Sequence, residues 1–143
     1  MPSILDVADE VVATVTAQFA AVTTCTRKYR PNLTLEQMDP ATITATVVPK
    51  DKNRSILTAS TSQRDMEIDL AIQKKLITEN DLSESDPLTK LLESIEDYFW
   101  LRKLPSTGAT CVKAKYQPIF SQEMMQTQNS FTGVLTLTFR FIG

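Results

Sequence analysis

The end of the chain alternates between apolar and polar side chains with a period of two. In FTGVLTLTFRFIG, residues 131–143, the large apolar side chains Leu135, Leu137, Phe139 and Phe141 fall on odd positions with Phe131, and threonine and arginine predominate on even positions. This alternation is typical of a strand with one buried face. The sequence therefore predicts a final strand that packs its phenylalanines and leucines against another layer.

Three earlier segments alternate in the same way. TITATVVP (42–49) places Ile43, Ala45 and Val47 opposite threonines, and Pro49 is expected to end its pairing. MEIDLAIQKK (66–75) places Glu67 and Asp69 together on its outward face, and ATCVKAKYQP (109–118) places Cys111, Lys113 and Lys115 together on one face. Four main strands follow from this pattern.

Two segments have helical spacing. Residues 4–21 repeat apolar side chains every three or four positions after a Ser3–Asp6 capping pattern. In SESDPLTKLLESIEDYFWLRKLP (83–105), Asp86 is the expected N-cap, Pro87 the first helical residue, and Pro105 lies beyond the end. SQEMMQTQ (121–128) is interpreted as a short helix whose Met124 and Met125 fill the core.

The order of these elements predicts an α+β fold in one domain spanning residues 1–143. We expect about four strands in a mainly antiparallel sheet, with the two long helices packed on one face. Residues 23–40 are expected to form an irregular connection. Residues 50–64 are polar and charged around Ile56 and Leu57, and they predict a loop or long hairpin that extends from the body and contacts a neighbouring subunit.

Composition excludes several classes of function. The 143 residues include 15 Lys and Arg against 17 Asp and Glu, a net charge of -2 that argues against a dedicated binder of nucleic acid or anionic membranes. The chain has no histidine, which removes Ser-His and Cys-His pairs and most zinc sites. Cys25 and Cys111 are expected to be free thiols, because the acidic start MPSILDVADE does not resemble a signal peptide. No cofactor is indicated.

Candidate chemistry is sparse. Glu67 and Asp69 could form a metal-dependent hydrolase site, although solvated strand residues are the commoner interpretation. Glu93, Glu96 and Asp97 could form a metal cluster, although an outer helix face is again the commoner interpretation. Two clusters of basic residues could grip a nucleic-acid backbone or form ordinary ion pairs. The first consists of Arg27, Lys28 and Arg30, and the second of Lys113 and Lys115.

Trp100 and Leu101 lie off the apolar stripe of the second long helix. Either the following segment covers them, or they form a subunit contact, in which tryptophan is enriched.

Read from end to end, the chain resembles the tail terminators, a family of neck and tail-completion proteins of tailed bacteriophages. The resemblance rests on the order of SILDVADEVVATV, RKYRPNLTLEQMDPATITATVVPK, MEIDLAIQKKL, DPLTKLLESIEDYFWLRKL and YQPIFSQEMMQTQNSFTGVLTLTFRF. It implies a non-enzymatic virion protein, assembled in the host cytoplasm, that forms a ring of about six copies. Such a ring caps the tail tube, ends its polymerisation and joins the tail to the head connector. A head-completion or stopper protein is the alternative.

A ring needs two different contact surfaces on each protomer. The candidate contact residues lie in the polar segment, at the end of the second long helix and on the predicted strand 109–118. They are Arg54, Ile56, Leu57, Arg64, Trp100, Leu101, Lys113 and Lys115. Because carboxylates repel DNA phosphates, we expect Glu67 and Asp69, or else Glu93, Glu96 and Asp97, to line the channel through which DNA passes transiently. The two lysines of the fourth strand are expected to lie away from that channel.

Overall fold

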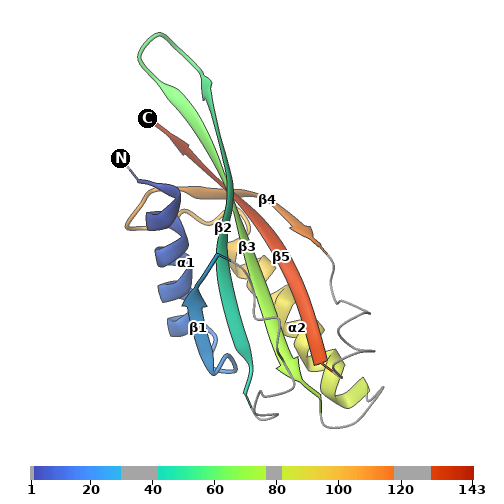
Figure 1. The fold of residues 1–143 in the computed structure, drawn as a ribbon. Helices are drawn as coiled ribbons and strands as arrows, with labels where there is room; N and C mark the ends of the chain where they lie inside the picture. The colour runs from blue at the N-terminus through green and yellow to red at the C-terminus, as the bar shows by residue number, and fades with distance from the viewer. Residues whose placement is uncertain (1, 30–41, 77–81, 118–129) are drawn as a thin grey trace.

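The computed structural model describes residues 2–29, 42–76, 82–117 and 130–143, which form an α+β fold with one five-stranded sheet and two long helices (Figure 1). The elements in chain order are α1 (Ile4–Gln18), β1 (Thr24–Arg27), β2 (Thr44–Ile56), β3 (Ser62–Lys75), α2 (Leu82–Phe99), β4 (Thr110–Tyr116) and β5 (Ser130–Ile142). The predicted fold class is confirmed. The predicted short helix at 121–128 lies outside the described residues.

The strands are ordered β1-β2-β3-β5-β4, and all neighbours are antiparallel except β1 and β2. The parallel strand β1 falls within the segment expected to be irregular. Its four residues, TCTR, carry no apolar alternation, and they pair with β2 from Thr24 opposite Thr44 to Arg27 opposite Val47. A strand this short at a sheet edge is held by its neighbour rather than by its own pattern.

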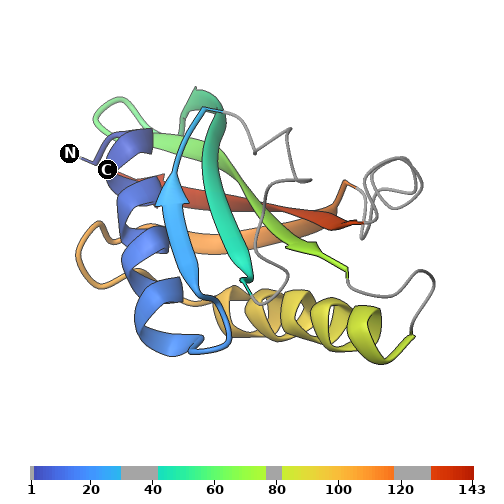
Figure 2. The same cartoon turned by 60° about the horizontal axis from the view of Figure 1, so that its bottom comes forward.

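Both helices pack on the same face of the sheet, as predicted. Val47, Leu70 and Leu135 lie side by side across β2, β3 and β5, and all three are buried in one cluster with α1 and α2. α1 lies over β1 and β2, and α2 lies over β5, so the two helices divide this face between them (Figure 2). The alternation of Met66, Ile68, Leu70 and Ile72 inward is confirmed, because each of them is fully buried.

The ends of the helices agree with the sequence only in part. Ser3 and Asp6 form the predicted capping box at the start of α1. The predicted start of α2 at Asp86 is wrong, because the helix begins at Leu82 and contains Pro87. Pro87 lies beyond the first turn, where a proline removes one backbone hydrogen bond and clashes with the carbonyl four residues earlier, at a cost of about 3 kcal/mol. Burial of Leu88, Leu92, Ile95 and Phe99 against the sheet outweighs that loss.

The predicted end of pairing at Pro49 is also wrong. β2 continues to Ile56 opposite β3, with an irregularity between Pro49 and Asp51. The proline is tolerated because β1 ends at Arg27, opposite Val47, so β2 has only one strand neighbour beyond that point. The result is the predicted long hairpin, which projects beyond the helices (Figure 1).

Candidate assembly surfaces

The projecting hairpin, residues 50–62, forms an arm that exposes apolar side chains. All of residues 50–60 are exposed, with Ile56 at 85% and Leu57 at 47%. The turn is closed by Thr58 and Thr61, whose hydroxyl oxygens lie 2.6 Å apart, and by the amide of Leu57, which donates to the carbonyl of Thr61 at 3.1 Å. Ser62 and Gly143 exchange two backbone hydrogen bonds of 3.0 Å, so β5 supports only the base of the arm. An ordered turn that exposes two apolar side chains suits a contact with another molecule.

One side of the arm carries a row of cations. Lys52, Arg54 and Ile56 pair with Met66, Arg64 and Ser62 of β3, which places them on the side of the sheet that faces the helices. Arg64 is only 3% exposed, and its side chain forms no hydrogen bond or ion pair with any residue that the structure describes. Arg54 donates only to the Ser62 hydroxyl, at 3.3 Å. Two arginines thus lie directly opposite each other without a carboxylate among the described residues, an unfavourable arrangement for the free protomer.

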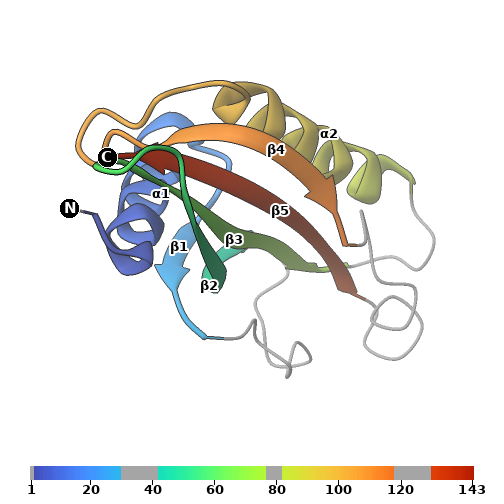
Figure 3. The same ribbon diagram turned by 90° about the horizontal axis from the view of Figure 1, so that it is seen from above.

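The sheet face away from the helices carries both signs of charge. Lys113, Thr138 and Glu67 form one row across β4, β5 and β3, and Lys115, Thr136 and Asp69 form the next. The strands run side by side on this face (Figure 3). The two pairs therefore share one face, about 10 Å apart at two strand spacings, while the expectation that the lysines lie away from the channel stays a prediction.

The prediction that Cys111 shares a face with these lysines is wrong. β4 has an irregularity between Cys111 and Lys113, so Cys111 pairs with the core residue Phe139 and is fully buried. The extra residue of a bulge reverses the alternation beyond it. Cys25 and Cys111 are both free thiols, and burial raises the pKa of each to about 11.

Support for a metal site at Glu67 and Asp69 does not emerge. The Asp69 carboxylate accepts a hydrogen bond of 2.6 Å from the Thr136 hydroxyl, which occupies one of its oxygens. No group of three potential ligands gathers within the described ranges. A two-carboxylate pair alone leaves most positions of a magnesium ion to water.

A second apolar surface lies at the end of α2. Trp100 and Leu101 are 49% and 63% exposed, so the following segment leaves them open. Leu101 has a φ of 57°, a left-handed conformation that costs a leucine about 1–2 kcal/mol. Its amide donates to the Cys111 carbonyl at 2.9 Å, which fixes the turn against β4.

The exposed side of α2 is acidic. Glu96 accepts a long hydrogen bond of 3.4 Å from the Tyr116 hydroxyl, and burial together with Glu96 raises the pKa of Tyr116 to about 12. Glu93 and Asp97 are exposed, and their carboxylates form no hydrogen bond or ion pair in the part of the chain that the structure describes. They are therefore available to an external cation.

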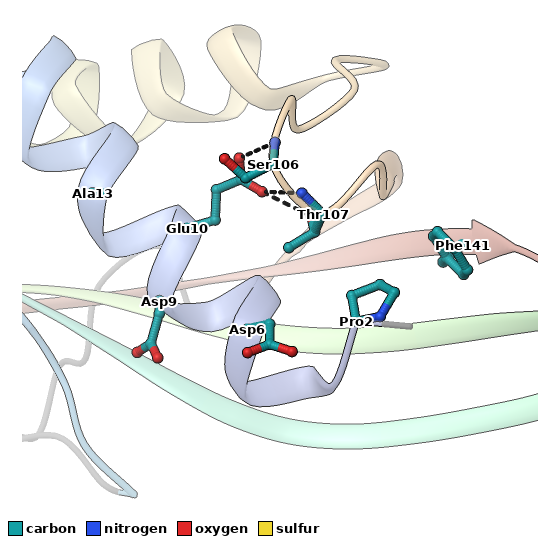
Figure 4. A pocket seen from close by; sticks show the side chains of 8 residues that line it. All are labelled: Pro2, Asp6, Asp9, Glu10, Ala13, Ser106, Thr107 and Phe141. Atoms are coloured by element: carbon teal, nitrogen blue, oxygen red, sulfur yellow. Dashed lines mark hydrogen bonds between the residues drawn. The ribbon is translucent and has the colours of Figure 1, made fainter.

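A shallow depression lies beside α1 (Figure 4). Its volume is about 780 Å³ and its lining includes Asp6, Asp9, Glu10 and Phe141. The carboxylates are already engaged: Asp6 in the capping box, Asp9 with Arg27 at 2.7 Å, and Glu10 with the turn at residues 106–107. The ion pair with Asp9 favours a structural role for Arg27 over contact with a nucleic-acid backbone. Arg30, Met124 and Met125 lie outside the described residues.

Comparison with known proteins identifies a likeness of fold. Neither protein-family models nor curated proteins match the chain. Among solved structures, a chain from "Virion of native gene transfer agent (GTA) particle" aligns with a TM-score of 0.61 and 11% sequence identity, covering 95% of this chain and 94% of that one. None of the described helices is long and apolar enough to span a membrane. The chain therefore has the same fold as a component of a gene transfer agent virion.

Proposed function

We propose that this chain is a structural protein of a phage-like virion, and more specifically a tail terminator. In this role about six copies form a ring that caps the tail tube, ends its polymerisation and joins the tail to the head connector. The observation that carries the proposal is the likeness of fold, over 95% of the chain, to a chain of a gene transfer agent virion. The resemblance of the sequence to tail terminators supplies the finer role.

Two further features support an assembling role. The apolar arm tip and the Trp100–Leu101 turn lie on different elements, and a ring requires two different surfaces that complement each other. Tryptophan is enriched among the residues that contribute most of the binding energy at interfaces. A catalytic role has less support, since the carboxylates of the sheet and of α2 lie on opposite sides of the molecule.

The proposal predicts a ring in solution and activity in tail assembly. Six copies of the 16.0 kDa chain give a ring of roughly 100 kDa, which light scattering and negative-stain images would detect. The purified chain should also restore joining of heads to tails that were assembled without it. A chain that binds filled heads but not tail tubes would instead be a stopper protein, and one that binds neither would refute the virion role.

The channel of the ring remains a prediction. Glu67 and Asp69 are the better candidates for its lining, but Lys113 and Lys115 share their face. A face of mixed charge retains duplex DNA weakly, because counterion release requires clustered cations. Tight binding of duplex DNA by the ring at physiological salt would contradict this assignment.

A further inference from the structure

We propose that the arm of one protomer docks on the outer stripe of α2 of the next copy of this chain. This stripe consists of Glu93, Asp97 and Trp100, followed by Leu101. The inference deepens the proposed ring and rests on it. It names the receiving surface, which neither the fold likeness nor the family resemblance supplies.

The arm and the α2 stripe are chemically complementary. Lys52 and Arg54 precede Ile56 on one side of the arm, and Glu93 and Asp97 precede Trp100 on α2. Each surface therefore presents two charges followed by a large exposed apolar side chain, with opposite signs of charge. Opposite charges at the rim of an interface steer association, while the apolar side chains supply the buried area.

The side chains of the two surfaces are also similarly spaced. Lys52, Arg54 and Ile56 alternate along a strand, so that the row spans about 13 Å. Glu93, Asp97 and Trp100 are spaced four and three residues apart on one side of a helix, a row of about 10.5 Å. Trp100 still belongs to the helical pattern, since its amide donates to the Glu96 carbonyl at 2.9 Å. Lysine and arginine side chains are long enough to absorb the difference, so Lys52 meets Glu93, Arg54 meets Asp97, and Ile56 meets Trp100.

No described carboxylate lies within ion-pair distance of the arginines of the arm. Arg54 and the 3% exposed Arg64 lie directly opposite each other, and the described residues provide them with no carboxylate. A carboxylate bound at the exposed Arg54 would lower the repulsion between these two guanidinium groups. Asp97 of a second copy can supply that carboxylate, and it breaks no side-chain hydrogen bond or ion pair with described residues in doing so.

The turn after α2 is strained. Leu101 adopts a left-handed conformation in which glycine is preferred, yet it holds a 63% exposed leucine beside Trp100. Such strain is commonly kept where the side chain has a function. Contact with Leu57 at the arm tip gives this leucine a role.

Because arm and stripe are different surfaces of one chain, the contact is heterologous and closes into a ring when the rotation permits. Arg54→Glu and Asp97→Arg should each weaken association at least about tenfold by sedimentation, and the double variant should recover to within about threefold of the native chain. Asp51→Lys, on the other side of the arm, is the matched control that should associate normally.

Cross-linking gives an independent test. Chains carrying Ile56→Cys and chains carrying Trp100→Cys are mixed and treated with a short bis-maleimide. Covalent dimers should form in the mixture but not with either variant alone or with the native chain, whose Cys111 is buried and Cys25 half-buried.

Three results would overturn the inference: single charge reversals that associate like the native chain, a double variant no better than either single, or a native chain that stays monomeric at millimolar concentration. The proposed function is judged separately, by whether the native chain rescues tail assembly. If the native chain rescues tail assembly but the double variant does not recover association, the docking contact is refuted and the proposed function stands.

Discussion

Glu10 of α1 is expected to stabilise the fold by holding the turn between α2 and β4. Its carboxylate accepts hydrogen bonds from the Ser106 amide at 2.8 Å, the Thr107 amide at 2.9 Å and the Thr107 hydroxyl at 2.8 Å (Figure 4). Hydrogen bonds to a charged acceptor contribute about 1.5–3 kcal/mol each when they are well shielded. Since this carboxylate is partly open to water, which would replace some of them, we expect Glu10→Gln to cost about 2 kcal/mol in total.

The loss should depend on pH. Burial raises the pKa of Glu10, but the hydrogen bonds from Ser106 and Thr107 together outweigh burial, and the pKa lies below its ordinary value of 4.5. A lowered folded-state pKa contributes stability that is fully present above the unfolded value and is lost as pH falls through the folded one. The difference between the native chain and Glu10→Gln should therefore be complete at pH 7 and shrink below about pH 4.5.

Chemical and thermal unfolding followed by circular dichroism measure this difference. At pH 7 the melting temperature of Glu10→Gln should fall by about 4–8 °C, given roughly 2–4 °C per kcal/mol for a domain of this size. Asp86→Asn is the matched control, because the Asp86 side chain is exposed, lies outside the proposed contacts and forms no hydrogen bond or ion pair with described residues. An equal loss at pH 7 and pH 3 would refute the role of the ionised carboxylate, and no loss at pH 7 would refute the role of the hydrogen bonds.

Three further predictions concern the turn, the arm and the thiols. Leu101→Gly should be more stable than Leu101→Ala by about 1 kcal/mol in urea unfolding, the reverse of the usual order, because only glycine relieves the left-handed strain. Deletion of residues 53–61 should leave a folded monomer that does not assemble, as judged by circular dichroism and light scattering, because this segment is almost wholly exposed; unfolding would show that it belongs to the core. Cys111 should react slowly with a thiol reagent at pH 8 and rapidly in denaturant, since burial raises its pKa to about 11, and fast reaction of the native chain would contradict that burial.

The sequence by itself determined the main elements and the buried face of each long strand. The alternation of Met66 to Ile72 and of Leu135 to Phe139 is decisive because a shift of one residue would turn every large apolar side chain toward water. The polar and charged composition of residues 50–64 predicted the projecting hairpin, and helical periodicity predicted that Trp100 and Leu101 lie off the core stripe. Local periodicity reports which side chains share a face.

Other features were decided only by the tertiary structure. The pairing of β1, the continuation of β2 past Pro49 and the bulge beside Cys111 each depend on which strand lies alongside, and periodicity does not encode that neighbour. Placement of Lys113 and Lys115 on the face of Glu67 and Asp69 follows from the strand order, in which β5 lies between β3 and β4. The opposition of Arg54 and Arg64 is likewise a matter of register, and it becomes visible only when the two strands are paired.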